Sequence, residues 1–382
     1  MIDKLTTLKI ILRGAMNKER LERLITLMHK ESLDAVVLNP GFSFKYLTNL
    51  EFHLMERPTI LVITKNGESQ LILPELEASR ALKEFSEEEI FTYSDNPALW
   101  SDFFKQTITK LNLGKCSIGI EANRIRFLEL ELIQNSLPDC KIVSANSVFS
   151  NFRIIKNSTE IEYMREAALI AQNALLETLK QPVVGMTEIN LASLLTINLL
   201  KHGSGELPFS PIIAAGPNSA DPHATPSDHV ISTGELLLFD WGASYKGYAS
   251  DITRTFAVGT VDPMFYEIAK LVGDANKQGR LTSKPGVTAG SIDDATRAII
   301  TNAGFGEYFN HRTGHGLGMD AHESPYIFSE NQQILEPGMV FTIEPGVYLP
   351  GKGGVRIEDD VVITDTGSRS LTDLPRDLKQ IG

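Results

Sequence analysis

Apolar and polar residues follow two periodicities along about the first 150 residues of the chain. Apolar residues spaced three and four apart predict helices at residues 17–30 and 99–111. Apolar runs rich in β-branched residues predict strands at residues 34–38, 59–64, 71–73, 117–120 and 141–143. This alternation indicates an α/β domain, which we expect to span residues 16–152 after an N-terminal extension at residues 1–15.

A strong helix signal opens the rest of the chain, which we expect to form a second domain over residues 153–382. Asn157 can cap this helix, and Glu160 stands three residues later, as in a capping box. Apolar residues at helical spacing then continue from Ile161 to Leu179, with charged residues on the other face.

The second region contains an internal repeat. Residues 185–206 align with residues 286–307 at a constant offset of 101, and the matched pairs are Gly185/Gly286, Thr187/Thr288, Gly203/Gly304, Gly205/Gly306 and Glu206/Glu307. Each copy predicts a Thr-capped helix ended by glycine, although chance or shared helix punctuation could give the same matches. Because each copy leads into a β-hairpin with two acids, we expect an α+β domain with a pseudo-two-fold repeat.

Paired acids are the chemical feature of both predicted hairpins. Asp240 and Asp251 are symmetric about a turn between Tyr245 and Lys246, so an unbulged hairpin would place them opposite each other. Glu344 and Glu358 are likewise symmetric about Gly351. Opposed carboxylates repel unless a cation lies between them or one is protonated, and two exposed strand acids are the alternative.

An imidazole completes the candidate site. His315 stands between glycines in Thr313-Gly-His-Gly-Leu-Gly318, and such glycines let a backbone come close to a site. Four carboxylates and one imidazole match two divalent ions, charge −4 against +4. Ligands rich in oxygen favour manganese, with cobalt, iron or zinc as alternatives, over a structural zinc site built from thiolates.

Composition limits the classes of partner. The 36 Lys and Arg against 48 Asp and Glu give a net charge of −12, which argues against a nucleic acid because phosphate binding needs a basic face. No apolar run reaches the roughly 18 residues of a membrane span. Cys116 and Cys140 are too few for a disulfide framework, so we expect a cytoplasmic, reducing location.

Five motifs resemble those of the pita-bread metallopeptidases, in particular the proline-specific branch of aminopeptidase P and prolidase (Xaa-Pro dipeptidase). They are Phe239-Asp-Trp-Gly-Ala, Ser250-Asp-Ile-Thr-Arg-Thr, Gly314-His-Gly-Leu-Gly, Thr342-Ile-Glu-Pro-Gly and Val355-Arg-Ile-Glu-Asp-Asp. The resemblance is strong over residues 153–382. Residues 16–152 are similar, through looser motifs, to the creatinase/prolidase N-terminal domain.

The resemblance implies a role for each of the five ligands. Asp240 would chelate one metal ion, and Asp251 would bridge both. His315 and Glu344 would bind the second ion, with Glu358 as the other bridge. Glu344 would also act as the proton shuttle of the hydrolysis.

Other residues match the family's substrate-binding positions. His223 would hydrogen-bond the substrate near the scissile bond, and His322 would stabilise the developing oxyanion; surface histidines are the alternative. Arg356 points to the same strand face as Glu358 and could orient carboxylates, or form a plain ion pair. Phe209 and Tyr348 would line the pocket, or pack in the core.

The resemblance implies hydrolysis of small peptides with proline in second position, by a homodimer. Methionine aminopeptidases share the five ligands but usually lack the N-terminal domain, and creatinase-like hydrolases lack the metal ligands. A non-catalytic binding protein on the same fold would have lost ligands that this chain keeps. Dipeptidase and aminopeptidase remain open, and a pocket closed by the N-terminal domain would favour the dipeptidase.

Overall fold

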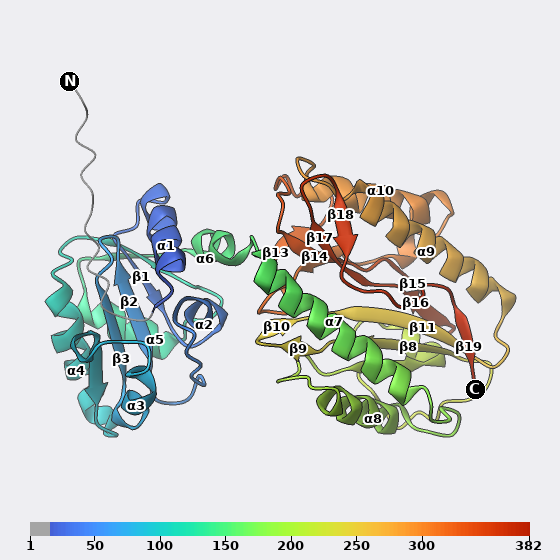
Figure 1. Cartoon of the computed structure of the whole chain (residues 1–382), viewed down its shortest axis with the longest axis horizontal. Helices are drawn as coiled ribbons and strands as arrows, with labels where there is room; N and C mark the ends of the chain where they lie inside the picture. Colours follow the sequence, from blue (N-terminus) through green and yellow to red (C-terminus); the bar gives the residue numbers. More distant parts are fainter. Residues whose placement is uncertain (1–15) are drawn as a thin grey trace. The chain divides into compact units, whose positions relative to one another are not determined.

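The computed structural model describes residues 16–382, so the extension expected at residues 1–15 lies outside the described residues. The chain divides into two compact units, one through Arg153 and the other from Ile154 to Gly382 (Figure 1). None of the helices in residues 16–382 combines the length and the apolar character needed to cross a membrane.

The first unit is built on a six-stranded mixed sheet in the order β4-β3-β2-β1-β5-β6. Its strands are β1 (Ala35–Leu38), β2 (Ile60–Thr64), β3 (Ser69–Pro74), β4 (Ile90–Tyr93), β5 (Ser117–Ile120) and β6 (Lys141–Ser144). All five predicted strands are present. The sequence analysis missed β4. This strand is only four residues long, and all of them except Tyr93 are only partly buried, so it has no long apolar run.

Helices cover this sheet and close its core. They are α1 (Lys18–Lys30), α2 (Phe42–Thr48), α3 (Ala78–Ala81), α4 (Trp100–Ile108), α5 (Phe127–Ser136) and α6 (Asn146–Arg153). Asn17 caps α1 by accepting the backbone N–H of Arg20, and the apolar stripe predicted for this helix is buried. Phe104 of α4 and Ile133 of α5 pack with Ile118 of β5 in one core cluster.

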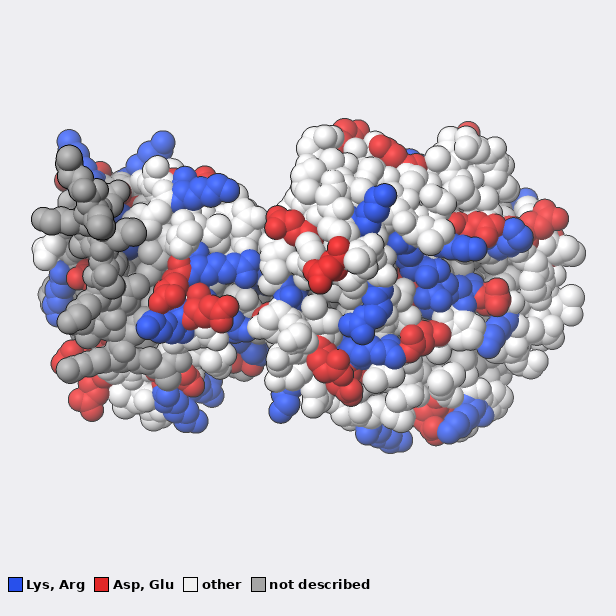
Figure 2. All heavy atoms as spheres, turned by 45° about the horizontal axis from the view of Figure 1, so that its top comes forward, with Lys and Arg blue, Asp and Glu red and all other residues white. Residues whose placement is uncertain are grey.

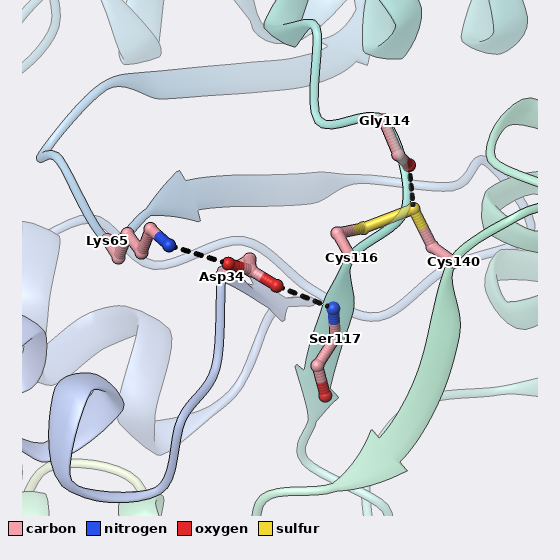
Figure 3. Close-up of a disulfide and its surroundings, with 6 residues drawn as sticks. All are labelled: Asp34, Lys65, Gly114, Cys116, Ser117 and Cys140. Carbon is pink, nitrogen blue, oxygen red and sulfur yellow. Dashed lines mark hydrogen bonds and ion pairs between the residues drawn. A yellow bond between two sulfur atoms is a disulfide. The ribbon is translucent and has the colours of Figure 1, made fainter.

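Cys116 and Cys140 form a disulfide (Figure 3). The sequence analysis, which saw too few cysteines for a disulfide framework, gave no reason to expect this bond. Its cause is the strand register: β5 and β6 run parallel with Ser117 opposite Lys141, so the cysteines that precede these residues are neighbours. Their Cα atoms lie 4.6 Å apart.

The second unit has two antiparallel-rich sheets with helices packed on them. One sheet has the order β19-β11-β8-β7 and the other β13-β12-β14-β17-β18. The first contains β7 (Ile212–Ala215), β8 (Leu236–Trp241), β11 (Ile252–Val258) and β19 (Lys379–Ile381). The second contains β12 (Gly314–Gly316), β13 (Glu323–Ile327), β14 (Val340–Ile343), β17 (Asp359–Ile363) and β18 (Ser368–Ser370).

Two short hairpins and four long helices complete this unit. The hairpins are β9 (Ser244–Tyr245) with β10 (Tyr248–Ala249), and β15 (Gly346–Leu349) with β16 (Gly353–Arg356). The helices are α7 (Ser158–Thr178), α8 (Glu188–Lys201), α9 (Pro263–Thr282) and α10 (Ala289–Asn302). Figure 1 shows α9 and α10 together at the top of the unit and α8 at its lower side. The capping box predicted at Asn157 and Glu160 starts α7.

The internal repeat is present in the backbone at the predicted offset. Helix α10 begins and ends 101 residues after α8, and their caps Thr187 and Thr288 each accept a backbone N–H three residues on. Each cap also forms an isolated bridge to a later segment, Thr187 to Val230 and Thr288 to Ile334. The α+β domain with a pseudo-two-fold repeat, expected from the sequence, is therefore present in the structure.

Charged side chains are mixed in sign on the surface. On the face shown in Figure 2, several Lys and Arg side chains lie near the middle of the second unit, with Asp and Glu side chains around and between them. This mixture agrees with a chain of net charge −12.

Candidate metal centre

The five predicted ligands line one cavity of the second unit. Its volume is about 710 Å³, and Asp240, Asp251, His315, Glu344 and Glu358 all contribute to its wall. Asp251, His315 and Glu358 are buried, and the other two are partly buried. The fold brings the two hairpins together, so the paired acids of both halves of the repeat lie in one pocket, as the sequence predicted.

The first hairpin differs from the predicted register. Thr253, not Asp251, stands opposite Asp240, because the turn is centred on Lys246 and Gly247 and not before Lys246. Both turn residues have positive φ, 51° and 82°, as a two-residue hairpin turn of type I′ requires. Asp251 consequently lies just before β11, diagonal to Asp240 and not directly across from it.

The second hairpin keeps the predicted register. Ile343 pairs with Asp359 on one side, and Gly346 pairs with Arg356 on the other. Glu344 and Glu358 lie between these pairs, in positions that continue the same register about Gly351. Thr342 donates to Glu344 Oε1 across 3.2 Å and so helps to orient this carboxyl group.

His315 reaches the acids from the central part of its sheet. It lies on β12, and its Nε2 is 3.4 Å from Glu344 Oε1 and 3.7 Å from Asp251 Oδ2. The flanking glycines allow this position, because a Cβ on Gly314 would stand 1.9 Å from the Thr342 carbonyl oxygen. A Cβ on Gly316 would stand 2.1 Å from the Ser324 carbonyl oxygen. The glycines thus let the neighbouring strands approach His315.

Ligand atoms converge in three overlapping groups within the described residues. Each has its candidate atoms within 4.8 Å of one another, and the groups are Asp240/Asp251/Glu358, His315/Glu344/Glu358 and Asp251/His315/His322. Oδ1 of Asp240 and Oδ1 of Asp251 are buried without a hydrogen-bond partner. Buried carboxylate oxygens left unpaired are costly, so these residues fit divalent metal ions.

The titration behaviour of the acids supports the same fit. Burial raises the pKa of Asp251 and of Glu358 well above its ordinary value, and the neighbouring acids raise it further. Burial likewise raises the pKa of Glu344 to about 7. Burial lowers the pKa of His315 well below its ordinary value, which favours the neutral imidazole that binds metals.

Arg356 organises the acids from behind. It donates to Asp240 Oδ2 across 2.5 Å and to Thr253 Oγ1 across 3.1 Å, and Thr253 in turn donates to Glu358 Oε2 across 2.6 Å. The arginine therefore holds one carboxylate directly and a second through a threonine. The sequence left two roles open for Arg356, and its contacts are compatible with both. It forms an ion pair with Asp240, and through Thr253 it can orient Glu358.

Of the four other residues predicted for the substrate pocket, three line the cavity and one lies behind its wall. His223, His322 and Phe209 line the cavity, with both histidines exposed and the His322 ring centroid 4.0 Å from that of His315. Tyr348 is not among the lining residues. It is 3% exposed, and its hydroxyl accepts from Arg356 Nη1 across 2.9 Å and lies 2.9 Å from His311 Nε2.

The sequence analysis did not single out several residues that shape the site. Thr253 stands two residues after Asp251, and Thr342 stands two before Glu344, so the period of a strand could have found both. Arg312 lines the cavity, yet nothing in its local sequence marks it beyond its place next to His311. His311 also lines the cavity, and the signal that could have found it is its place four residues before His315 in the sequence.

Two matches to known families cover the two units. Residues 162–365 match metallopeptidase family M24, and residues 20–155 match the creatinase/prolidase N-terminal domain. The first match alone spans more than half of the chain. The chain belongs to metallopeptidase family M24. This confirms the family, the fold class and the enzyme class that the five motifs predicted.

Several known proteins are similar to this chain over nearly its whole length. A Xaa-Pro dipeptidase of Pyrococcus horikoshii is 35% identical over 362 residues, 94% of this chain and 98% of the relative. The crystal structure of a prolidase from Thermococcus sibiricus superposes with a TM-score of 0.90 at 33% identity, covering 95% of this chain and 99% of that one. An X-Pro aminopeptidase from Thermotoga maritima gives 0.81 at 32% identity, covering 94% and 99%.

Proposed function

We propose that this M24 member hydrolyses the bond between an N-terminal residue and proline, with two divalent metal ions bound by Asp240, Asp251, His315, Glu344 and Glu358. The observation that carries the proposal is the convergence of these five side chains, two of them with unpaired buried oxygens, in one cavity. Relatives named Xaa-Pro dipeptidase cover 94% of the chain, which supports the choice of substrate.

The donor set divides naturally between two ions. Asp240, Asp251 and Glu358 form one group, and His315 and Glu344 share Glu358 in another. When bound, the ions would supply a Lewis acid for the scissile carbonyl and an acidified water. The oxygen-rich set favours manganese, with cobalt, iron or zinc as alternatives.

The protein's own groups would hold the substrate and move the proton. Glu344, which lines the cavity, would take a proton from the attacking water and pass it to the proline nitrogen. His322 stands beside His315 and would donate to the developing oxyanion, and His223 would bind near the scissile bond from the opposite half of the repeat. Proline provides no N–H, so a site dedicated to it does not depend on that donor.

A dipeptide is the substrate length we favour. The relatives that cover the chain include named dipeptidases, and a cavity of about 710 Å³ has room for a small peptide. The aminopeptidase alternative has its own support in the Thermotoga maritima neighbour. We keep the homodimer and the cytoplasmic location in the proposal, but the Cys116–Cys140 bond removes the argument from the cysteines for a reducing compartment.

A substrate panel tests the proposal. The purified protein, treated with a chelator and reloaded with Mn²⁺ or Co²⁺, is offered Ala-Pro, Ala-Pro-Ala and Met-Ala-Ala. We expect the metal-free protein to be inactive, and the loaded protein to cleave Ala-Pro faster than Ala-Pro-Ala and to leave Met-Ala-Ala intact. Preference for the tripeptide would make the protein an Xaa-Pro aminopeptidase, and cleavage of Met-Ala-Ala alone would refute proline specificity.

A further inference from the structure

Asn276 of α9 connects the two chain segments that carry Glu344 and Glu358. Its side chain is fully buried, and its Nδ2 donates to the Ile343 carbonyl oxygen across 2.9 Å and to that of Ile357 across 3.4 Å. Each of these carbonyl groups belongs to the residue immediately before a proposed metal ligand. One amide group therefore holds the backbone beside both glutamates.

The orientation of this amide is defined by its partners on both sides. Asn276 Oδ1 accepts from Arg280 Nε across 2.9 Å, one helical turn later. Carbonyl oxygens need a donor and an arginine N–H needs an acceptor, so only one of the two amide orientations satisfies all three partners. The Nδ2 group consequently faces the segments of the metal ligands.

The amide lies where the second hairpin is interrupted. The pairing of β14 with β17 stops next to Glu344 and Glu358, and the pairing of β15 with β16 starts on their other side. The Glu344 N–H donates to the Thr313 carbonyl oxygen across 2.8 Å. The Glu358 N–H donates to that of Thr253 across 3.1 Å. The two glutamates are thus bonded to different neighbouring segments, and Asn276 ties their own segments together across the interruption.

Two glycines bring α9 close enough for a short side chain to reach the hairpin. Gly273 and Gly279 stand three residues before and after Asn276, on the same face of the helix. A Cβ on Gly279 would stand 2.9 Å from Ile343 Cγ2, and one on Gly273 would stand 3.7 Å from Ile357 Cδ1. Helix α9 also packs on β14, β15 and β16 (Figure 1). This packing holds the amide in place before any ligand binds.

The internal repeat gives Asn276 a counterpart with different partners in the first half. Glu344 stands 104 residues after Asp240, and the residue 104 positions before Asn276 is Gln172 of α7. The amide oxygen of Gln172 accepts the backbone N–H groups of residues 373 and 374. The counterpart therefore holds the C-terminal segment, whereas Asn276 acts on the ligands of the second half.

We propose that Asn276 is a positioning residue of the metal centre, which fixes the separation of Glu344 and Glu358 and thereby the affinity for the ion that they share with His315. The inference deepens the proposed function and rests on it. Glu344, Glu358 and His315 form one group of candidate ligand atoms, and of these three only Glu358 also belongs to the group that contains Asp240. Loss of the amide should therefore weaken the ion beside His315 more than the other ion.

The test measures the affinity for each ion separately. Chelated wild type, Asn276→Asp and Asn276→Ala are titrated with Mn²⁺ by isothermal titration calorimetry, and His315→Ala identifies the binding event of the ion beside it. Asn276→Asp keeps the size and removes the donors, and Asn276→Ala is the milder change because it adds no charge. We expect both variants to weaken that event about 10- to 100-fold, and the other event less than about threefold, because groups that support metal ligands have effects of this size.

A second readout and a matched control separate positioning from a general loss of structure. Activity of both variants on Ala-Pro should fall at low Mn²⁺ and recover when Mn²⁺ is raised, with KM for the peptide unchanged. Asn198→Asp is the control, because Asn198 is also a buried asparagine on a long helix, and its Nδ2 donates to Thr178 Oγ1 across 3.0 Å. This variant should lower Tm without changing either affinity.

The outcomes that contradict the inference differ from those that contradict the proposed function. Equal weakening of both ions, unchanged affinities, or lost activity that added Mn²⁺ does not restore would overturn the role of Asn276. The same selective weakening in Asn198→Asp would also overturn it, because the effect would then follow from lost stability. A wild type that binds no Mn²⁺ or cleaves no Xaa-Pro peptide would overturn the proposed function itself.

Discussion

Removing the charge of Asp251 tests its assignment as a bridging metal ligand. It belongs to two of the three groups of candidate ligand atoms, and its backbone N–H already donates to Asp360 Oδ2 across 3.1 Å. Asp251→Asn keeps the size and that N–H but removes the charge. Because even residues that only support ligands are worth about 10- to 100-fold, we expect activity to fall by more than about 100-fold, with loss of bound metal.

Two measurements test the predicted losses in Asp251→Asn. Inductively coupled plasma mass spectrometry gives the bound metal, and kcat/KM for Ala-Pro gives the activity. Asp365→Asn, at an exposed acid away from the cavity, is the control and should keep both. A fully loaded and fully active Asp251→Asn protein would contradict the assignment of Asp251 as a bridging ligand.

The two exposed histidines separate catalysis from metal binding. His322 stands near enough to Asp251 and His315 to count as a candidate ligand, whereas we assign it and His223 to the substrate. We therefore expect His223→Ala and His322→Ala to keep both metal ions and lose about 10²- to 10³-fold in kcat. Loss of an ion from His322→Ala would move this histidine into the ligand set, and unchanged rates in both variants would make the histidines bystanders.

Single residues also show how far sequence reasoning reaches. The acids and His315 could be recognised because each stands in a local motif whose chemistry is visible in a few letters. Tyr348 could not be assigned in this way, since its contacts depend on residues brought next to it by the fold. For Tyr348 the sequence left pocket lining and core packing open, and the structure buries this residue with its hydroxyl between Arg356 and His311.

At the scale of elements, the approach of strands to β12 depends on glycine. A Cβ on Gly316 would stand 2.1 Å from the Ser324 carbonyl oxygen and 2.6 Å from that of Glu323. Gly316→Ala should therefore push β13 away from β12 and displace the adjacent His315. We expect a loss of about 2 kcal/mol in stability, roughly 4–8 °C in Tm, and reduced activity.

Thermal melting and kcat/KM are compared with those of Gly367→Ala. An added Cβ at Gly367 meets nothing within 4 Å, so this control should be close to neutral. An unchanged melting temperature in Gly316→Ala would show that β13 moves aside without cost.

The pairing register of the strands is the feature that was hardest to predict from the sequence. Local signals predicted the helices, their caps and the 101-residue offset of the repeat. These signals are the spacing of apolar residues and the capping and terminating residues of each helix. The turn at Lys246 and Gly247 was misplaced by one residue because alternative centres looked equally acceptable in the sequence. The Cys116–Cys140 bond likewise depends on the pairing of β5 with β6, which two isolated cysteines do not reveal.

At the scale of the whole molecule, the buried acids make the metal-free protein sensitive to pH. The pKa of Glu344 is about 7 in the folded chain, above its ordinary value of 4.5, and those of Asp251 and Glu358 are raised as well. Groups with raised pKa stabilise the fold below their unfolded pKa, and this stabilisation is lost as pH rises through the folded pKa. We therefore expect the Tm of chelated protein to fall between about pH 5 and pH 8.

Differential scanning calorimetry with and without Mn²⁺ measures this effect. Added metal should raise Tm most at the upper end of the range, where all the carboxylates are free to bind it. Glu344→Gln has no titrating group at this position, so its chelated form should show a shallower fall. A Tm that is constant or rises from pH 5 to pH 8 in the chelated wild type would contradict the expectation.

The last strand has a practical consequence for handling the protein. β19 pairs in parallel with β11, Phe256 opposite Lys379 and Val258 opposite Ile381, and so covers the outer edge of the strand that follows Asp251. Only Gly382 would separate an affinity tag fused after it from this pairing, and a proteolytic trim of a few residues would uncover the edge. An unpaired strand edge can form hydrogen bonds with a strand of another chain. If a preparation of the protein self-associates, loss of the β19 pairing is therefore the first cause to check.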